Sequence, residues 1–385
     1  MHDTDSVRRS VLVTAVIVLA ACGLRPAPKS PDIPRAINKL TLIAQYSIPP
    51  LGRYPPGYGL PFGGVSGITT RRTGAELFGV SDAQHGGRIY RFAQEGDGAS
   101  FRVTPTALIS LEAQPDRFHA DDESMTFLPD GTMIVCSEGN VGEPRQPPAL
   151  TQYGRDGNFI RVLPVRDRYV PEPTGQQTKG ARGNAGFESV TLSPDGERLF
   201  AGVESALVQD GEPANFTAGT DTRLLEYVPR RDHFEPAREF VYRLEPVFKP
   251  SYEAGVFLIN GLADLLAVDR TTLLALERGY VEQKDRPGHG LNQIRIYRIA
   301  LTGATDVSAL DSIKGHSEIV PVTKTLILDL AQAQGLSAEL GQSLDNFEGM
   351  AFGPRLPDGR ATLLLVSDDN FSAAQRTWFL WFAIE

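Results

Sequence analysis

The chain has 385 residues, of which 41% are hydrophobic and 22% charged, a balance typical of a globular protein rather than a disordered one. Its formal net charge is -9 and it has no long basic run, which argues against binding to nucleic acid or to anionic lipid. A charged partner is therefore expected to be a cation.

The first residues have the layout of a bacterial export signal. Arg8 and Arg9 precede an apolar run over residues 11–21, which is too short to span a membrane stably. Residues 19–22 (LAAC) resemble the lipobox, in which the cysteine is acylated and begins the mature protein, and the following glycine resembles lipoproteins of the outer membrane. We predict a signal peptide over residues 1–21, a lipidated Cys22 at the start of a Pro-rich tether over 22–38, and a folded domain over 39–385. The protein would then be exported and lipid-anchored at the cell envelope, on the periplasmic side or the surface.

Past the tether, short β-type runs separated by turn residues predominate, which indicates an all-β fold. Three segments share an acid, an apolar strand and a proline in register: ESMTFLPDG from Glu123, ESVTLSPDG from Glu188 and EGMAFGP from Glu348. Weaker copies begin at Ser66 and Asp264. A second apolar run follows each copy, so each unit is predicted to be a β-hairpin with a tight turn.

Further strands follow these hairpins, and units of four strands repeated radially form a β-propeller. We count five blades, and the stretch between Glu204 and Asp264 leaves room for a sixth. The apolar run over residues 39–47 has no hairpin of its own, while the last unit ends abruptly near Ile384. The N-terminal strand is therefore predicted to complete the last blade and close the ring, which removes free sheet edges.

Acidic residues mark the ends of these hairpin strands. Because a tight hairpin returns the chain to the end it left, the acids should gather at one mouth of the central channel. Two carboxylates about 7 Å apart repel by about 2 kcal/mol at an effective dielectric constant near 20, so the group must bind cations, pair with arginine or hold protons. Oxygen-only ligands favour Ca²⁺, and less so Mg²⁺, over zinc. The candidate metal ligands are Glu123, Glu138, Glu188, Glu204, Glu277, Glu348 and Asp368.

The ordered set of motifs across residues 60–372 resembles the phytase-like family, also called the esterase-like domain of phytases. The motifs are GVSGI from Gly64, GFES from Gly186, LERG from Leu276, NFEGM from Asn346 and SDDNF from Ser367. The resemblance implies a propeller and suggests phosphoester chemistry.

On this basis we hypothesise a Ca²⁺-dependent hydrolase of small phosphoesters, acting as a monomer. Glu188 and Glu348 would be catalytic, and Arg278 would neutralise the phosphate or pair with a neighbouring acid. Two alternatives stay open: a non-catalytic envelope propeller that binds a protein or glycan, and a metal-dependent hydrolase of the lactonase type. The acids could also simply accept structural hydrogen bonds at strand ends.

Overall fold

The computed structural model describes residues 36–50, 61–71, 76–115, 121–140 and 142–385. The predicted signal peptide and Cys22 lie outside the described residues. Within them, no helix is both long and apolar enough to cross a membrane.

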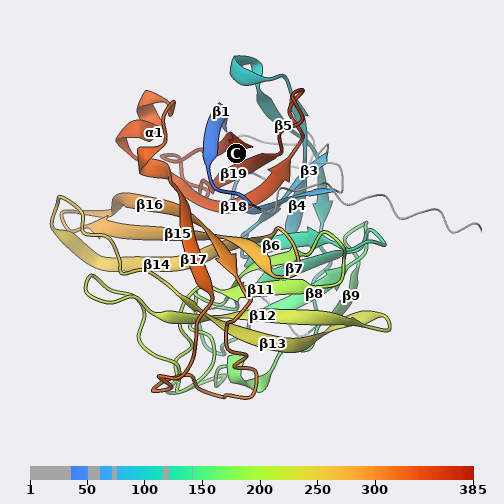
Figure 1. Cartoon of the computed structure of the whole chain (residues 1–385), viewed down its shortest axis with the longest axis vertical. Coiled ribbons are helices and arrows are strands. Elements are labelled where there is room, and N and C mark those ends of the chain that lie inside the picture. The colour runs from blue at the N-terminus through green and yellow to red at the C-terminus, as the bar shows by residue number, and fades with distance from the viewer. Residues whose placement is uncertain (1–35, 51–60, 72–75, 116–120, 141) are drawn as a thin grey trace, which may run out of the picture.

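Five antiparallel sheets of four strands make up the fold (Figure 1). The predicted five-bladed β-propeller is confirmed. The first blade contains β2 (Val65–Arg71), β3 (Glu76–Ser81), β4 (Arg88–Glu95) and β5 (Arg102–Ser110), and the second contains β6 (Asp122–Phe127), β7 (Met133–Ser137), β8 (Ala149–Tyr153) and β9 (Phe159–Val162). The third blade contains β10 (Phe187–Leu192), β11 (Leu199–Val203), β12 (Asp221–Arg230) and β13 (His233–Arg243). The fourth blade contains β14 (Ala254–Ala267), β15 (Thr272–Gln283), β16 (Arg286–Ala300) and β17 (Thr323–Asp329).

The fifth blade joins the two ends of the described chain. It contains β18 (Asn346–Gly353), β19 (Thr362–Asp368), β20 (Thr377–Ile384) and, as its outermost strand, β1 (Leu40–Ile48). β1 runs antiparallel to β20, with Leu40 opposite Ile384, and in Figure 1 it lies in blue among the red strands of the last blade. The predicted closure by the N-terminal strand is thus present.

No sixth blade lies between Glu204 and Asp264. That stretch instead supplies β12 and β13, the two outer strands of the third blade, before β14 opens the fourth. Helical structure among the described residues is limited to the 3-10 turns η1 (Gly98–Ser100), η2 (Asp167–Tyr169) and η3 (Leu330–Gln332) and the single α-helix α1 (Ala338–Gln342).

The Pro-Asp-Gly motifs form the turns that fold the inner hairpins back. In the second blade Leu128 and Thr132 pair across the turn, the Asp130 carboxylate accepts from the Thr132 amide at 2.8 Å, and Gly131 has φ +87°. A side chain at a φ of this sign is disfavoured, so glycine suits the position. The tight turn brings the end of each second strand back beside the start of the first.

The hydrophobic core lies between blades. Each of the five interfaces between neighbouring sheets contains one cluster of buried apolar side chains, such as Phe78, Met125 and Val135 between the first and second blades. The innermost strands β2, β6, β10, β14 and β18 contact one another in a closed order around the axis. Since inner strands begin at one end of the ring, their first residues face a common mouth.

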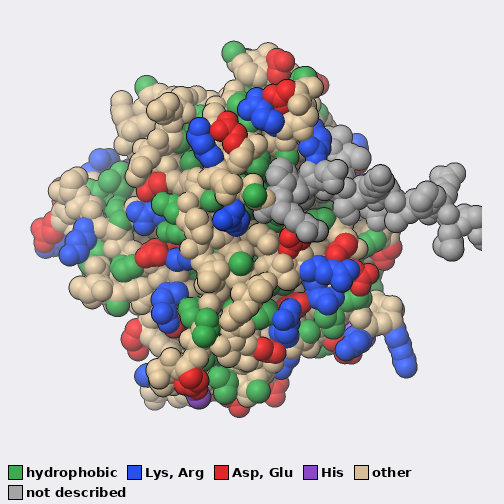
Figure 2. All heavy atoms as spheres, viewed as in Figure 1, with side chains coloured by type: hydrophobic (Ala, Val, Ile, Leu, Met, Phe, Trp, Pro, Cys, Tyr) green, Lys and Arg blue, Asp and Glu red, His purple; other side chains and the backbone are tan. Residues whose placement is uncertain are grey.

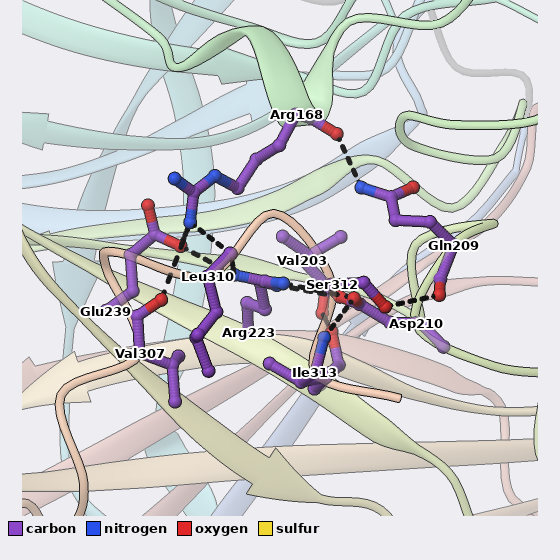
Figure 3. A network of polar contacts seen from close by, with 12 residues as sticks. Arg168, Val203, Gln209, Asp210, Arg223, Glu239, Val307, Leu310, Ser312 and Ile313 are labelled. Atoms are coloured by element: carbon purple, nitrogen blue, oxygen red, sulfur yellow. Dashed lines mark hydrogen bonds and ion pairs between the residues drawn. The ribbon is translucent and has the colours of Figure 1, made fainter. Parts of the chain in front are cut away.

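A buried ionic network fixes the long connection between β16 and β17, residues 301–322, against the outer edge of the third blade (Figure 3). Arg223 has no exposed surface and binds Asp210 with two hydrogen bonds of 2.7 and 3.0 Å. Its third nitrogen donates to Glu239 at 3.0 Å and to a carbonyl of the connection, and Arg168 donates to Glu239 and to the same segment. We call Arg168, Asp210, Arg223 and Glu239 the ionic clamp.

Candidate functional site

Each innermost strand carries a β-bulge, which lies near the first residue in four blades and in the second half of the longer β14 in the fourth blade. The pairing with the second strand shifts by one at the same place in all five blades, so that one residue per blade stands outside the regular register. A bulge re-aims the side chain that it contains. The bulged residues, here called the bulge positions, are Ser66, Glu123, Glu188, Ala263 and Glu348.

A second set of equivalent residues lies along the second strand of each blade, at or just past its last residue in four blades and within β15 in the fourth. In four blades the backbone of this residue pairs with the residue that lies two places before the bulge position on the first strand. In the fourth blade the equivalent pair is Gly261 with Arg278. These strand-end positions are occupied by Asp82, Glu138, Glu204, Arg278 and Asp368.

In the fourth blade the bulge position lies one residue earlier in the chain than the repeats in the sequence predict. Asp264, expected at the place of the repeated glutamate, lies one residue past the bulge position, where Ala263 stands. The Asp264 carboxylate instead accepts from the amides of Leu265 and Met350 at 2.8 and 2.6 Å, which ties β14 to β18.

The same displacement separates Glu277 from the other candidate ligands. Side chains alternate between the two faces of a strand, so the neighbour Arg278 faces the mouth and Glu277 faces away. Glu277 accepts hydrogen bonds from Tyr242 and Lys324, each at 2.7 Å, and from Asn260 at 2.9 Å. The structure thus places Glu277 in a separate, fully paired polar group.

The remaining predicted ligands come together at the mouth with two more acids. Asp121, Glu123 and Glu138 form one triad, in which one carboxylate oxygen of each residue lies within 4.8 Å of the other two. Glu138, Glu188 and Glu204 form a second triad by the same measure. Glu138 belongs to both triads. We call the whole group the carboxylate cluster; it comprises Asp82, Asp121, Glu123, Glu138, Glu188, Glu204, Glu348 and Asp368.

Burial raises the pKa values of seven of the eight carboxyl groups in the cluster, and repulsion from neighbouring carboxylates adds to the shift for most of the seven. Loss of solvation is the first cause and repulsion from neighbouring carboxylates the second for Glu123, Glu138 and Glu188, whose pKa values lie well above the ordinary range. Burial, together with Glu348 and other neighbours, raises the pKa of Asp82 to about 7. Burial also raises the pKa of Glu204 to about 7, although Arg278 opposes the shift.

Arg278 is the cation that contacts the cluster most directly. Its Nη2 lies 3.1 Å from Glu348 and 3.3 Å from Glu204, so it bridges the third and fifth blades from its place on the fourth. Glu348 also accepts from the Asn346 amide group at 2.7 Å. Arg278 thus pairs with two of the eight carboxyl groups, and Arg88 acts on Asp82 at the rim, so the described residues leave the cluster acidic unless cations or protons enter it.

Glu188 presents an atom suited to an incoming ligand. The residue is 6% exposed, and its Oε2 is buried with no hydrogen-bond partner among the described residues. A buried unpartnered carboxylate oxygen costs free energy that a bound cation or donor would recover. Close packing shapes the same place: a Cβ on Gly261 would lie 2.4 Å from the Glu204 Oε1, so only glycine leaves that oxygen its room.

Asp82 and Asp121 were not among the ligands predicted from the sequence. Asp121 precedes the second inner strand in the left-handed conformation, with φ 47°. A weak signal existed: it occupies the place of Gly64 and Gly186, two residues before the bulge position. Aligning Gly261 with these glycines would also have assigned Ala263 and Arg278 correctly.

The rim beside Asp82 carries a strained turn. Asn370 and Phe371, which follow the SDD sequence, both have positive φ, 47° and 50°. The Asp369 carboxylate holds the turn by accepting from the amides of Gly64 and Phe371 at 2.9 and 3.1 Å. Non-glycine residues in this conformation cost free energy and concentrate at functional sites.

On the face drawn in Figure 2, basic and acidic side chains are interspersed. No single sign dominates that face, in contrast to the carboxylate cluster inside the mouth.

Comparison with known proteins gives one extended match. A family model described as "Phytase-like: Esterase-like activity of phytase" matches residues 60–371. A protein of Arthroderma benhamiae named "Uncharacterized secreted protein" is 27% identical over 132 residues, which is 29% of this chain and 24% of that protein.

Solved structures resemble the chain only in outline. Hydrazine synthase of Kuenenia stuttgartiensis aligns with 82% of this chain and 81% of its own at 13% identity and a TM-score of 0.32. A putative 6-phosphogluconolactonase of Bacteroides uniformis aligns with 78% of this chain and 77% of its own, also at 13% identity and a TM-score of 0.32. Similarity at this level says nothing about function.

Proposed function

The chain belongs to the phytase-like family, and from this premise we propose that it is an exported, lipid-anchored hydrolase that cleaves small phosphoric esters with Ca²⁺ held by the carboxylate cluster. The family supports a hydrolase-like role. The ion, the ester and the anchor are the further steps of the proposal.

The observation that carries the proposal is the convergence of Glu138, Glu188 and Glu204, together with the buried Oε2 of Glu188 that has no hydrogen-bond partner among the described residues. Three carboxylate oxygens within 4.8 Å of one another suit a hard cation with oxygen ligands. Neither histidine nor cysteine belongs to either triad, so the chemistry of the group fits Ca²⁺ better than zinc, and Mg²⁺ less well because of its strict octahedral geometry. Asp121 and Glu123 extend the site around Glu138.

When bound, the ion would polarise the phosphorus centre and accept phosphate oxygens. The chain's own groups would then orient the ester. Arg278 offers a fixed positive charge on the side of the mouth opposite the second blade, and Glu348 and Glu204 hold its guanidinium in place. Glu188, whose Oε2 has no hydrogen-bond partner among the described residues, would accept a proton from an attacking water.

The location follows from the N-terminal sequence. Residues 19–22 supply the lipobox-like signal and Cys22 the acylation site, and the tether to residue 38 leads to the ring. The Arthroderma benhamiae relative is named a secreted protein, which supports export of this chain. The lipid would be the only contact with the membrane, and a monomer would suffice because one ring contains the whole site.

The test uses the purified protein with and without Ca²⁺ on p-nitrophenyl phosphate and inositol hexakisphosphate. We expect Ca²⁺-dependent hydrolysis, and we expect Glu188→Gln to reduce kcat/KM by about 100-fold or more, since a positioned proton acceptor contributes about 10²–10⁴-fold. Calorimetry should show weaker Ca²⁺ binding by the same variant.

The matched control is Glu226→Gln. Glu226 is also buried in the third blade, but Arg198 and Arg238 pair with it at 2.8 and 2.5 Å. It should retain the wild-type dependence of activity on Ca²⁺. Wild-type protein that hydrolyses neither ester in the presence of Ca²⁺ would refute the proposed activity.

A further inference from the structure

The fourth blade departs from the pattern of acidic residues that the other blades present at the mouth, both at the bulge position and at the strand-end position. At the bulge position, three of the other four blades have glutamate and the fourth blade has Ala263. At the strand-end position, all four other blades have aspartate or glutamate and the fourth blade has Arg278. The one blade that contributes no acid thus contributes a cation.

The guanidinium occupies the space between two blades that would otherwise repel. Arg278 reaches Glu204 of the third blade and Glu348 of the fifth, at 3.3 and 3.1 Å, and its side chain is only 14% exposed. Gly261, which pairs with Arg278 across the two strands, leaves room for the Glu204 carboxylate that the guanidinium contacts, since a Cβ there would lie 2.4 Å from the Glu204 Oε1. Without the arginine, Glu204 and Glu348 would share a buried space with no positive charge between them.

We infer that Arg278 is a built-in counter-ion that takes the place of one divalent cation, so that the protein binds one cation fewer than its ring of carboxylates would otherwise need. The carboxylates that Arg278 does not pair with, Glu138 and Glu188 among them, are left for the exchangeable ion. This inference rests on the proposed cation site and specifies its occupancy.

The decisive variant is Arg278→Gln, which removes the charge and supplies an amide oxygen between Glu204 and Glu348. Carboxylate and amide oxygens are ligands that Ca²⁺ takes readily. Isothermal titration with Ca²⁺ should show one more ion per chain for this variant than for the wild type. The rise in Tm on adding Ca²⁺ should be about twice that of a wild type that binds one ion, because each occupied site stabilises the folded chain separately.

Two further variants make the result specific. Arg278→Lys keeps the charge and should keep the wild-type number of ions. Arg295→Gln removes a half-buried arginine from the same blade, where it pairs with Asp329 at 3.2 Å outside the mouth, and should also leave the number unchanged.

The inference is overturned if folded Arg278→Gln binds the same number of ions as the wild type, or if it is destabilised and Ca²⁺ does not restore it. These outcomes are separate from failure of the proposed function, which shows as a wild type without Ca²⁺-dependent hydrolysis. The comparison between the variant and the wild type decides the role of Arg278 whether or not either protein hydrolyses an ester.

Discussion

The ionic clamp and the carboxylate cluster both bury charge, and they differ in how that charge is paired. In the clamp, Asp210 and Glu239 face the guanidinium of Arg223, and Arg168 adds a second. Asp210 also accepts from the amide of Ile313 at 2.9 Å, so the clamp fastens a loop (Figure 3). In the cluster, Arg278 pairs with two of the eight carboxyl groups, Glu204 and Glu348, and the Oε2 of Glu188 has no hydrogen-bond partner among the described residues.

The contrast shows that burial of acids alone does not indicate a ligand site. Paired charges hold a structure together, because removing one partner leaves the other without compensation. Like charges without counter-ions do the reverse, because their repulsion destabilises the ligand-free structure and favours the binding of cations or protons. The clamp should therefore respond to mutation but not to Ca²⁺, and the cluster should respond to both Ca²⁺ and pH.

The largest effect is expected from Arg223→Gln in the clamp. The change leaves Asp210 and Glu239 buried without their main partner, and breaking a buried ion pair in this way costs about 3–5 kcal/mol of the free energy of unfolding. Urea unfolding measures the loss, with and without Ca²⁺. Full recovery of stability by Ca²⁺ would contradict the division between the two regions.

A somewhat smaller effect is expected from pH on the Ca²⁺-free protein. The folded-state pKa values of Asp82 and Glu204 are raised to about 7, so folding favours their protonated forms. The stabilisation is complete below the ordinary carboxyl pKa values and is lost as the pH rises through about 7. At about 1.4 kcal/mol per pKa unit, either group can contribute on the order of 3 kcal/mol.

Thermal melts of chelator-treated protein from pH 4 to pH 8 measure this dependence. Stability should fall toward neutral pH, and saturating Ca²⁺ should remove the fall, since the ion binds the deprotonated carboxylates. A Ca²⁺-free protein that becomes more stable over the same range would show that the cluster is neutralised in another way.

The smallest effect is expected from Glu277→Gln. Glu277 belongs with Lys324 and Tyr242 and not with the cluster, so the change weakens a charge-assisted hydrogen bond and should cost about 1.5–3 kcal/mol, toward the low end because Lys324 also pairs with Glu245 at 2.8 Å. Ca²⁺ binding measured by calorimetry should be unchanged. A loss of affinity comparable to that of Glu188→Gln would place Glu277 among the ligands after all.

Most of the fold could be predicted from the repeat of strand, turn and strand, because hairpins of equal length that recur along a chain favour radial packing. The number of blades followed once the stretch after Glu204 was assigned to outer strands of the third blade. Six of the seven predicted ligands belong to the cluster, since a tight turn returns its strand to the starting edge whatever the surrounding structure.

The rest of the site depends on features that repeats do not encode. Glu277 and Arg278 are adjacent, and only the register of the bulge on β14 decides which one faces the mouth. Asp121 lies just before β6, outside any strand, and it approaches Glu123 and Glu138 from a backbone conformation with positive φ. The unpartnered oxygen of Glu188 likewise follows from three-dimensional packing alone.

The pairing of β1 with β20 also bears on how the protein folds. β1 precedes the other strands of the ring in the chain and β20 follows them, with Leu40 opposite Ile384, so the ring cannot close before both strands are available. A chain cut between them would leave β1 without its partner and would expose sheet edges that favour aggregation. Ring closure thereby depends on the contact between the two strands that are farthest apart in the described sequence.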